Sequence, residues 1–382
     1  MRTNKMCAIL GNAHESRELL PLTEKRPLAT LPFDCKYRLL DFALSNVVNA
    51  NIKSVYMVFN QGRTKSVFDH IGGGREWHLD SIESRFFIHF YQDVLQKRAD
   101  GENYYEAAID YLKKSKSEYT VFIGNKMICN IDLRGVLKSH QSNDSKLTVV
   151  YKKMPKDQIA YQDLILTINE NGQVEEQNRF YDEQSDTELK NLCMNIFIMN
   201  TKWLIYALEE GQKKGGPASM QEFLALCMEL YPTTAYEYTG FLSNVFDIKS
   251  YYEANMSMLE PKKFSSLLYA DRKIFTKLKN EVATYYSGDS DVRNSQFATG
   301  CIVEGVVRNS LFSRNAHVEK QAEIHDSVVM ANAVIKKGAI VKYAILDKNV
   351  EIEAGVKVTG TPEKPIVIKK GQKIKEDIFG GE

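Results

Sequence analysis

The stretch MCAILGNAHESRELLPLTEKRPLATLPF, which spans residues 6–33, predicts the fold and the position of its central site. Met6–Leu10 is a short apolar run, and an α/β fold places a phosphate-binding turn directly after a buried first strand of this kind. Such a turn needs glycines, because backbone N–H groups must approach the phosphate closely. Here one glycine is followed by residues that carry side chains: Gly11, then Asn12, Ala13, His14 and Glu15. The turn therefore occupies the place of a nucleotide-binding loop without its glycines.

Strand and helix patterns alternate downstream of this turn. The segments are a helix over Tyr37–Ala50, a strand over Ser54–Asn60, a helix over Glu106–Ser117, a strand over Tyr119–Gly124, a helix over Leu133–His140 and a strand over Leu147–Lys152. Alternation at this spacing is typical of βαβ units. It predicts an α/β domain with a mainly parallel sheet.

A different pattern begins near Asp291. Apolar residues recur near positions 302, 307, 312, 318, 324, 329, 335, 341, 346, 352 and 358, with a spacing close to six. This repeat is typical of a parallel β-helix, in which each coil packs its apolar residues on its neighbours. The span holds about eleven hexads, which predicts between three and four coils at roughly three hexads each. We expect the tail from Pro362 onward to add a final edge strand and a mobile end.

The composition excludes several classes of protein. A chain of 382 residues with 43% apolar residues can fill the cores of two domains. Fifty basic residues stand against 49 acidic ones, so the net charge of +1 gives no electrostatic case for nucleic acid or an anionic membrane. The N-terminus lacks a signal-peptide core and no apolar run reaches about 18 residues, so we expect a cytoplasmic protein. The six cysteines form no C-x-x-C pair, which argues against a zinc site or a disulfide framework.

Four segments resemble one protein family. They are PLT (Pro21–Thr23), PF (Pro32–Phe33), KYRLLDFALSN (Lys36–Asn46) and HIGGGREWHLD (His70–Asp80). Together with the first turn they are similar to the sugar-nucleotide pyrophosphorylases, in particular bacterial glucose-1-phosphate adenylyltransferase (ADP-glucose pyrophosphorylase). The resemblance implies a Rossmann-like, GT-A-like nucleotidyltransferase domain over residues 1–258, a connector over 259–290, and a left-handed parallel β-helix with a C-terminal tail over 291–382.

The same resemblance shows where this chain departs from the family in its first turn. The two adjacent glycines of the family fall on Asn12 and Ala13, and its third glycine falls on Glu15. The phosphate-binding lysine of the family falls on Leu28, which carries no charge. Among the matched residues of this turn, Arg17 retains the family's arginine.

Both carboxylates that hold Mg²⁺ in the family have become amides. The first falls on Asn125, directly after the strand Tyr119–Gly124, and the second on Asn244 in the segment TGFLSNVFD. An amide carries no charge to balance a divalent cation, and Lys126 would repel one. Asn125 is also compatible with an ordinary turn residue. We expect the Mg²⁺ site to be lost, and with it any cofactor.

The sugar pocket of the family is altered as well. Tyr104 and Tyr105 stand where the family has small residues, which predicts a filled pocket. The family's sugar-phosphate lysine falls on Gln177, and Asn195 replaces a glycine that admits the glucose. These departures predict little or no activity for the chain alone, and no catalytic residue.

Three basic residues keep their charge. Lys36 and Arg38, together with Arg314 in the repeat region, match residues that bind anionic effectors such as sugar phosphates in the family. Isolated basic residues are often solvated surface, so the two interpretations stay open here. Retention of charge beside lost catalytic positions favours an anion site.

Three functions follow as hypotheses. The pattern of departures is similar to that of a non-catalytic relative in bacterial glycogen biosynthesis, which implies a regulatory subunit that assembles with a catalytic glucose-1-phosphate adenylyltransferase, as a tetramer. The alternatives are an active adenylyltransferase and a stand-alone sugar-phosphate sensor. We expect the β-helix to serve a hetero- or homo-oligomer. Acyltransferases also use hexapeptide β-helices with a histidine base, but His317 and His325 are more simply solvent-facing turn residues.

Overall fold

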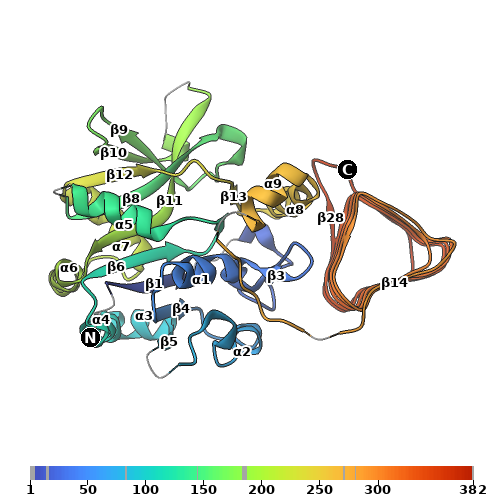
Figure 1. The fold of residues 1–382 in the computed structure, drawn as a ribbon, viewed down its shortest axis with the longest axis horizontal. Helices are drawn as coiled ribbons and strands as arrows, with labels where there is room; N and C mark the ends of the chain where they lie inside the picture. The colour runs from blue at the N-terminus through green and yellow to red at the C-terminus, as the bar shows by residue number, and fades with distance from the viewer. Residues whose placement is uncertain are drawn as a thin grey trace.

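The structure, a computed structural model, describes residues 5–13, 17–81, 84–143, 145–182, 187–269, 272–279 and 281–380. A domain of sheet and helices makes up one side of the molecule, and a triangular prism of short strands makes up the other (Figure 1). Figure 1 shows the helices α8 (Ile248–Met256) and α9 (Pro261–Leu268) between the two. Helix α9 and the first prism strand, β14 (Tyr285–Tyr286), lie within the stretch predicted as a connector.

The first strand lies at the centre of the large sheet. β1 (Met6–Asn12) pairs in parallel with β4 (Ser54–Phe59) on one side and with β6 (Tyr119–Gly124) on the other. Cys7 and Ile9 pack into one core and Ala8 and Leu10 into another, because successive side chains of a strand point to opposite faces. Burial on both faces explains why the run Met6–Leu10 is continuously apolar.

The rest of the sheet is mixed. β5 (Arg85–Phe90) continues the parallel part beyond β4, whereas β11 (Leu189–Asn200) pairs antiparallel with β6. The remaining strands of this sheet are β8 (Leu147–Pro155), β9 (Leu164–Ile168), β10 (Val174–Arg179) and β12 (Thr233–Glu237). The predicted nucleotidyltransferase-like α/β domain with a mostly parallel sheet is confirmed.

Helices cover both faces of the sheet. Apolar residues of α1 (Leu39–Asn49), α2 (Lys65–Ile71) and α5 (Leu133–Ser142) pack on one face. Those of α4 (Glu106–Ser115), α6 (Thr201–Lys213) and α7 (Met220–Leu230) pack on the other, and α3 (Tyr91–Ala99) follows β5. The helices and strands predicted between residues 37 and 152 all form, with ends within three residues of the predicted ones.

The C-terminal prism is the predicted left-handed parallel β-helix. Its three sheets contain six, six and five strands in the described residues. The first sheet is β14, β17 (Ile302–Val303), β20 (His317–Val318), β23 (Val334–Ile335), β26 (Glu351–Ile352) and β29 (Lys373–Ile374). The second is β15 (Asp291–Arg293), β18 (Val306–Arg308), β21 (Glu323–His325), β24 (Ile340–Lys342), β27 (Lys357–Thr359) and β30 (Ile378–Phe379). The third is β16 (Gln296–Phe297), β19 (Leu311–Phe312), β22 (Val328–Val329), β25 (Ala344–Leu346) and β28 (Ile366–Ile368).

One expectation about the β-helix was wrong, namely the number of coils. The strands make up five coils and part of a sixth, rather than three to four, because the coils begin before Asp291 and continue through the tail to Phe379. The apolar position near 302 is Val303, which is fully buried, whereas Ile302 is 41% exposed. The other hexad positions from Val307 to Val358 are fully buried as predicted.

The corners of the coils use asparagine. Asn315, Asn332 and Asn349 have φ values of 56°, 61° and 59°, and asparagine tolerates this left-handed region better than most residues. Their side chains form a ladder, in which the amide of Asn332 donates to Asn349 at 3.0 Å. The sequence carried this corner signal in addition to the apolar repeat.

A shared apolar cluster joins the two domains. It combines Leu28, Phe33 and Tyr251 of the first domain with Leu311 and Ile345 of the β-helix. Polar contacts surround it: Tyr252 donates to the carbonyl of Asp326 at 2.6 Å, and Arg26 forms a buried ion pair with Asp347. The junction is therefore a packed interface. In the part of the chain that the structure describes, no helix has the length and apolar character needed to cross a membrane.

Candidate functional site

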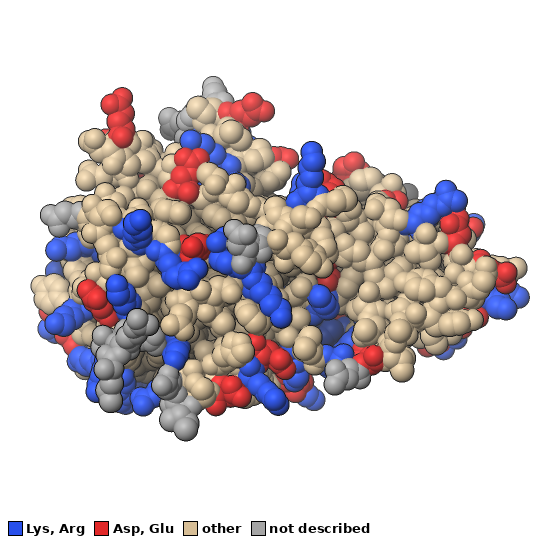
Figure 2. All heavy atoms as spheres, in the orientation of Figure 1, with Lys and Arg blue, Asp and Glu red and all other residues tan. Residues whose placement is uncertain are grey.

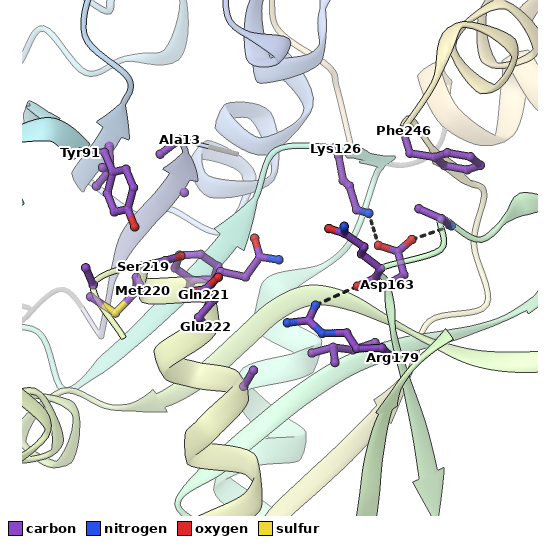
Figure 3. Close-up of a pocket in the computed structure, with 18 of the residues that line it drawn as sticks. Ala13, Tyr91, Lys126, Asp163, Arg179, Ser219, Met220, Gln221, Glu222 and Phe246 are labelled. Atoms are coloured by element: carbon purple, nitrogen blue, oxygen red, sulfur yellow. Dashed lines mark hydrogen bonds and ion pairs between the residues drawn. The ribbon is translucent and has the colours of Figure 1, made fainter. Parts of the chain in front are cut away.

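A cavity of about 930 Å³ opens at the carboxyl ends of β1 and β6, where parallel sheets bind ligands. Figure 3 shows Lys126 and Asp163 on one side of it and the start of α7, Ser219–Glu222, on another. Tyr104 and Tyr105 line the cavity but do not fill it, so the predicted filled pocket was wrong. Their hydroxyls are directed to the backbone of the loop before α7, where they donate to the carbonyls of Gly216 and Pro217 at 2.9 and 2.6 Å.

The first turn has side chains where a phosphate cradle would need open backbone. Asn12 is buried, and its amide donates to the carbonyl of Leu10 at 3.3 Å. Gly11 serves packing: an added Cβ would lie 2.6 Å from the ring of Phe122. Ala13 and Arg17 line the cavity as predicted from the position of the turn, and Glu15 lies outside the described residues.

Leu28 does not face the cavity. It begins the short 3₁₀ turn Leu28–Thr30, is 2% exposed, and belongs to the apolar cluster between the domains. The position matched to a phosphate-binding lysine is therefore part of a hydrophobic interface in this chain.

A buried ion pair stands beside the two amides at the predicted metal position. Asn244 ends β13 (Leu242–Asn244), which pairs antiparallel with β7 (Met127–Cys129) and thereby lies next to Asn125 and Lys126. The ammonium of Lys126 pairs with the carboxylate of Asp163, and both residues are less than 10% exposed. Asp163 also accepts from the amide of Asn244 at 2.7 Å and from the backbone of Ala160 at 3.0 Å.

This arrangement does not fit a divalent cation. Mg²⁺ prefers carboxylate oxygens, and the nearest carboxylate is already bonded to an ammonium, an amide and a backbone N–H. Among the described residues, no group of three or more His, Cys, Asp or Glu side chains could hold a metal ion. Sequence reasoning found both amides and Lys126, but it missed Asp163, whose place in the loop before β9 carries no signal of its own.

Two polar atoms of the amides have no hydrogen-bond partner. These are Nδ2 of Asn125 and Oδ1 of Asn244, each buried within the described part of the chain. A buried polar atom without a partner costs about 1–3 kcal/mol. The amides are therefore not optimised for stability alone.

The sugar-phosphate side of the cavity differs from the prediction. Gln177 is not among the residues that line the cavity, and its amide donates to the carbonyl of Ala225 at 2.7 Å and to Glu229 at 2.9 Å. Arg179, two residues further on, does line the cavity. Asn195 has a φ of 53°, which explains why a glycine is common at such a position.

The three predicted effector residues differ in their surroundings. Arg38 lies within electrostatic range of Arg314 and of Arg26, and burial lowers the pKa of its guanidinium. Lys36 is exposed instead, with its ammonium 4.9 Å from the ring of Tyr37. Arg314 is paired with Glu281 at 3.2 Å, so an anion would have to compete with that carboxylate.

Two lysines that sequence reasoning missed join this cluster. Burial and the charges of Arg38 and Arg26 lower the pKa of Lys348 to about 7. Burial and Arg314 lower the pKa of Lys279 as well. These shifts mean that positive charge is crowded at the junction, in a place where an anion would be stabilised.

The two histidines of the β-helix were expected in turns, which was wrong: both lie in strands. His317 is in β20 and His325 in β21, with ring nitrogens 3.4 and 3.6 Å from carboxylates of Glu304 and Glu323. Both are partly exposed and pair with surface carboxylates.

Comparison with known proteins agrees with this geometry. The nucleotidyl transferase family model matches residues 15–260, and the model of the GlmU-like C-terminal hexapeptide matches residues 282–366. The first match covers more than half of the chain, so the class of protein is that of the nucleotidyl transferases.

Two curated relatives extend over nearly the whole chain. The glycogen biosynthesis protein GlgD of Bacillus subtilis (strain 168) is 32% identical over 378 residues, which is 97% of each chain. GlgD of Geobacillus stearothermophilus is 27% identical over 371 residues, or 96% of this chain and 97% of the relative. The chain therefore belongs to the GlgD glycogen biosynthesis proteins within the nucleotidyl transferase family.

Proposed function

We propose that this protein is a regulatory, largely non-catalytic subunit of ADP-glucose pyrophosphorylase in bacterial glycogen biosynthesis. It assembles with the catalytic subunit, as a hetero-oligomer of four chains, and changes the turnover and the effector response of that subunit. The relatives are glycogen biosynthesis proteins, which supports the pathway. The geometry of the cavity supports the proposed lack of adenylyltransferase activity.

One observation carries the proposal: the Lys126–Asp163 ion pair stands beside the two amides that replace the family's metal carboxylates. Phosphoryl transfer is catalysed almost entirely by positioning and by cations that stabilise charge. A side-chain ammonium tied to a buried carboxylate cannot bridge phosphate oxygens as a divalent ion does. Loss of a single preorganised stabilising contact costs about 10²–10³ in rate, so we expect turnover near zero.

The cationic junction supports an effector role. Arg26, Arg38, Lys279, Arg314 and Lys348 come from both domains, so an anion bound among them would connect the β-helix to the nucleotidyltransferase-like domain. A coupling of this kind is typically worth about 1–3 kcal/mol between sites. Sugar phosphates are the chemical class that such a cluster would take.

The surface offers a place for a partner. Val282, Tyr285 and Tyr286 are 78%, 60% and 47% exposed at the first coil, where β14 leaves one edge of its sheet without a neighbouring strand in the described residues. Open strand edges with apolar side chains are typical association sites. Figure 2 also shows charges of both signs interspersed over the first domain and a broad area without charged side chains on the β-helix.

The test uses the full chain alone and together with its cognate catalytic subunit. We expect no pyrophosphate release from Mg²⁺, ATP and glucose 1-phosphate by the chain alone, co-elution of the two proteins, and a changed rate or effector response of the mixture. Turnover of the isolated chain at about 1–10³ s⁻¹ would instead establish an adenylyltransferase. No co-elution and no kinetic effect would leave a sugar-phosphate sensor.

The proposed interface has its own control. Tyr285→Lys should abolish co-elution, because it places a charge in the apolar edge. Tyr206→Lys is a matched control, since Tyr206 is 58% exposed on α6, in the other domain. Equal behaviour of the two variants would place the interface elsewhere.

A further inference from the structure

The cavity of the first domain carries a feature that the loss of metal chemistry does not explain. Tyr161 and Tyr181 line the cavity, and their rings stack with centroids 4.8 Å apart and an interplanar angle of 27°. They are nevertheless 70% and 48% exposed. Their backbones are joined by a hydrogen bond of 3.2 Å from Tyr181 to Tyr161, so the pair is held at the mouth of the cavity.

The wall behind this pair is also aromatic. Tyr56, Tyr91, Tyr104, Tyr105 and Phe122 line the cavity from β4, the start of α3, the region before α4, and β6. The hydroxyls of Tyr104 and Tyr105 bond to backbone carbonyls, which fixes the two rings. A volume of about 930 Å³ is large for one small metabolite, since ligand cavities span roughly 300–1,000 Å³.

The charges of the cavity do not favour a polyanion. The described lining residues include three basic side chains and four acidic ones: Arg17, Lys126 and Arg179, and Glu18, Asp163, Glu222 and Asp247. Lys126 and Asp163 neutralise each other. The remaining groups give a slight excess of negative charge, so a nucleoside triphosphate without its cation would gain little here.

We propose that this cavity binds the end of a neutral α-1,4-linked glucosyl chain, with a sugar ring on the exposed tyrosine pair. The apolar C–H face of a hexose packs on an aromatic ring, and its hydroxyls bond to planar polar side chains. Gln162, Arg179 and Glu222 supply such groups around the cavity. Because the relatives are glycogen biosynthesis proteins, the proposed ligand is a chain of glucose units and not another neutral molecule.

The inference is independent of assembly with a catalytic subunit. It concerns a different ligand and a different domain surface from the junction cluster and the β-helix edge. Failure of co-elution would leave it standing, and failure of glucan binding would leave the regulatory proposal standing.

The experiment titrates the full-length chain with maltoheptaose by calorimetry and measures its migration in native gels with and without glycogen. We expect saturable binding of maltoheptaose, retardation by glycogen, and no binding of the β-1,4-linked cellohexaose. Tyr161→Ala and Tyr181→Ala should each weaken binding by about tenfold, which corresponds to one aromatic contact. Tyr206→Ala, which removes a tyrosine of similar exposure on α6, should bind as the parent does.

Because all three tyrosines are exposed, we expect their substitution to leave the fold intact. Unchanged melting temperatures of the variants would confirm that weaker binding does not come from unfolding. Absence of binding and of retardation by the parent would overturn the inference. So would equal weakening by all three tyrosine variants, or binding of ATP, ADP-glucose or glucose 1-phosphate in place of maltoheptaose.

Discussion

Removal of the Lys126 ammonium tests whether this side chain stabilises the fold at the position that matches the family's metal ligands. The side chains of Lys126 and Asp163 are 10% and 5% exposed, so their pair is largely shielded from water. Lys126→Met leaves Asp163 with an uncompensated buried charge, which costs about 3–5 kcal/mol. For a domain of this size about 1 kcal/mol lowers the melting temperature by roughly 2–4 °C, so we expect a decrease of about 10 °C.

A double-mutant cycle by thermal melting isolates the pair. Asp163→Asn retains an oxygen for Asn244 and Ala160, and the double variant with Lys126→Met should recover much of the lost stability. Lys113→Met is the matched control, because it breaks an ion pair with Glu209 in which the two side chains are 55% and 40% exposed. This substitution should lower the free energy of unfolding by less than about 1 kcal/mol. The reasoning is refuted if Lys126→Met melts like the control, or if the effects of the two cavity variants simply add.

Three further changes give distinct readouts. Burial raises the pKa of Asp34 from 3.8 to about 7, so the free energy of unfolding falls as pH rises between these values. In urea melts, Asp34→Asn should therefore be neutral at pH 4 and stabilising by at most about 4 kcal/mol at pH 8. Equal effects at both pH values would contradict this. The pKa of Lys348 is lowered to about 7 by burial and the neighbouring arginines, so sulfate, whose charge does not change between pH 6 and pH 8, should bind more tightly at pH 6 than at pH 8 in calorimetry. Lys348→Met should flatten this dependence, whereas Lys337→Met, at an exposed position, should leave it unchanged; the same pH dependence in Lys348→Met would contradict this. Asn125→Asp together with Asn244→Asp should give no pyrophosphate release above background, and measurable turnover would show that the amides alone abolish activity.

The fold was predictable from the sequence because its signals are local. The apolar run Met6–Leu10 must be buried on both faces, and the hexad positions from Val307 to Val358 define the β-helix interior directly. The number of coils was not predictable from hexads alone, because the first coil at Tyr285 and the last strands up to Phe379 carry weaker repeats. These end coils have fewer neighbours to pack against, so their sequences are less constrained.

The site was predictable only where it depends on matched positions. Asn244 lies opposite Met127 in the β13–β7 pair, two residues from Asn125, at the ends of the strands. Asp163, Arg179 and Lys348 could not be found, because their roles arise from contacts between segments far apart in the chain. Crowded charges and ion pairs depend on the folded arrangement, so they cannot be predicted from single residues in the sequence.

Two residues that differ from the family's pattern, Leu28 and Asn244, make packing or hydrogen-bond contacts of their own. A lysine at Leu28 would place an ammonium in the apolar cluster that holds the two domains together, at a cost of several kcal/mol. An aspartate at Asn244 would face Asp163, which now accepts a hydrogen bond of 2.7 Å from the amide, and would replace that bond with repulsion between carboxylates. Leu28 and Asn244 thus each make a contact on which the present structure depends. A lysine at Leu28 or an aspartate at Asn244 would therefore lower the stability of the protein unless the residues packed against that position changed as well.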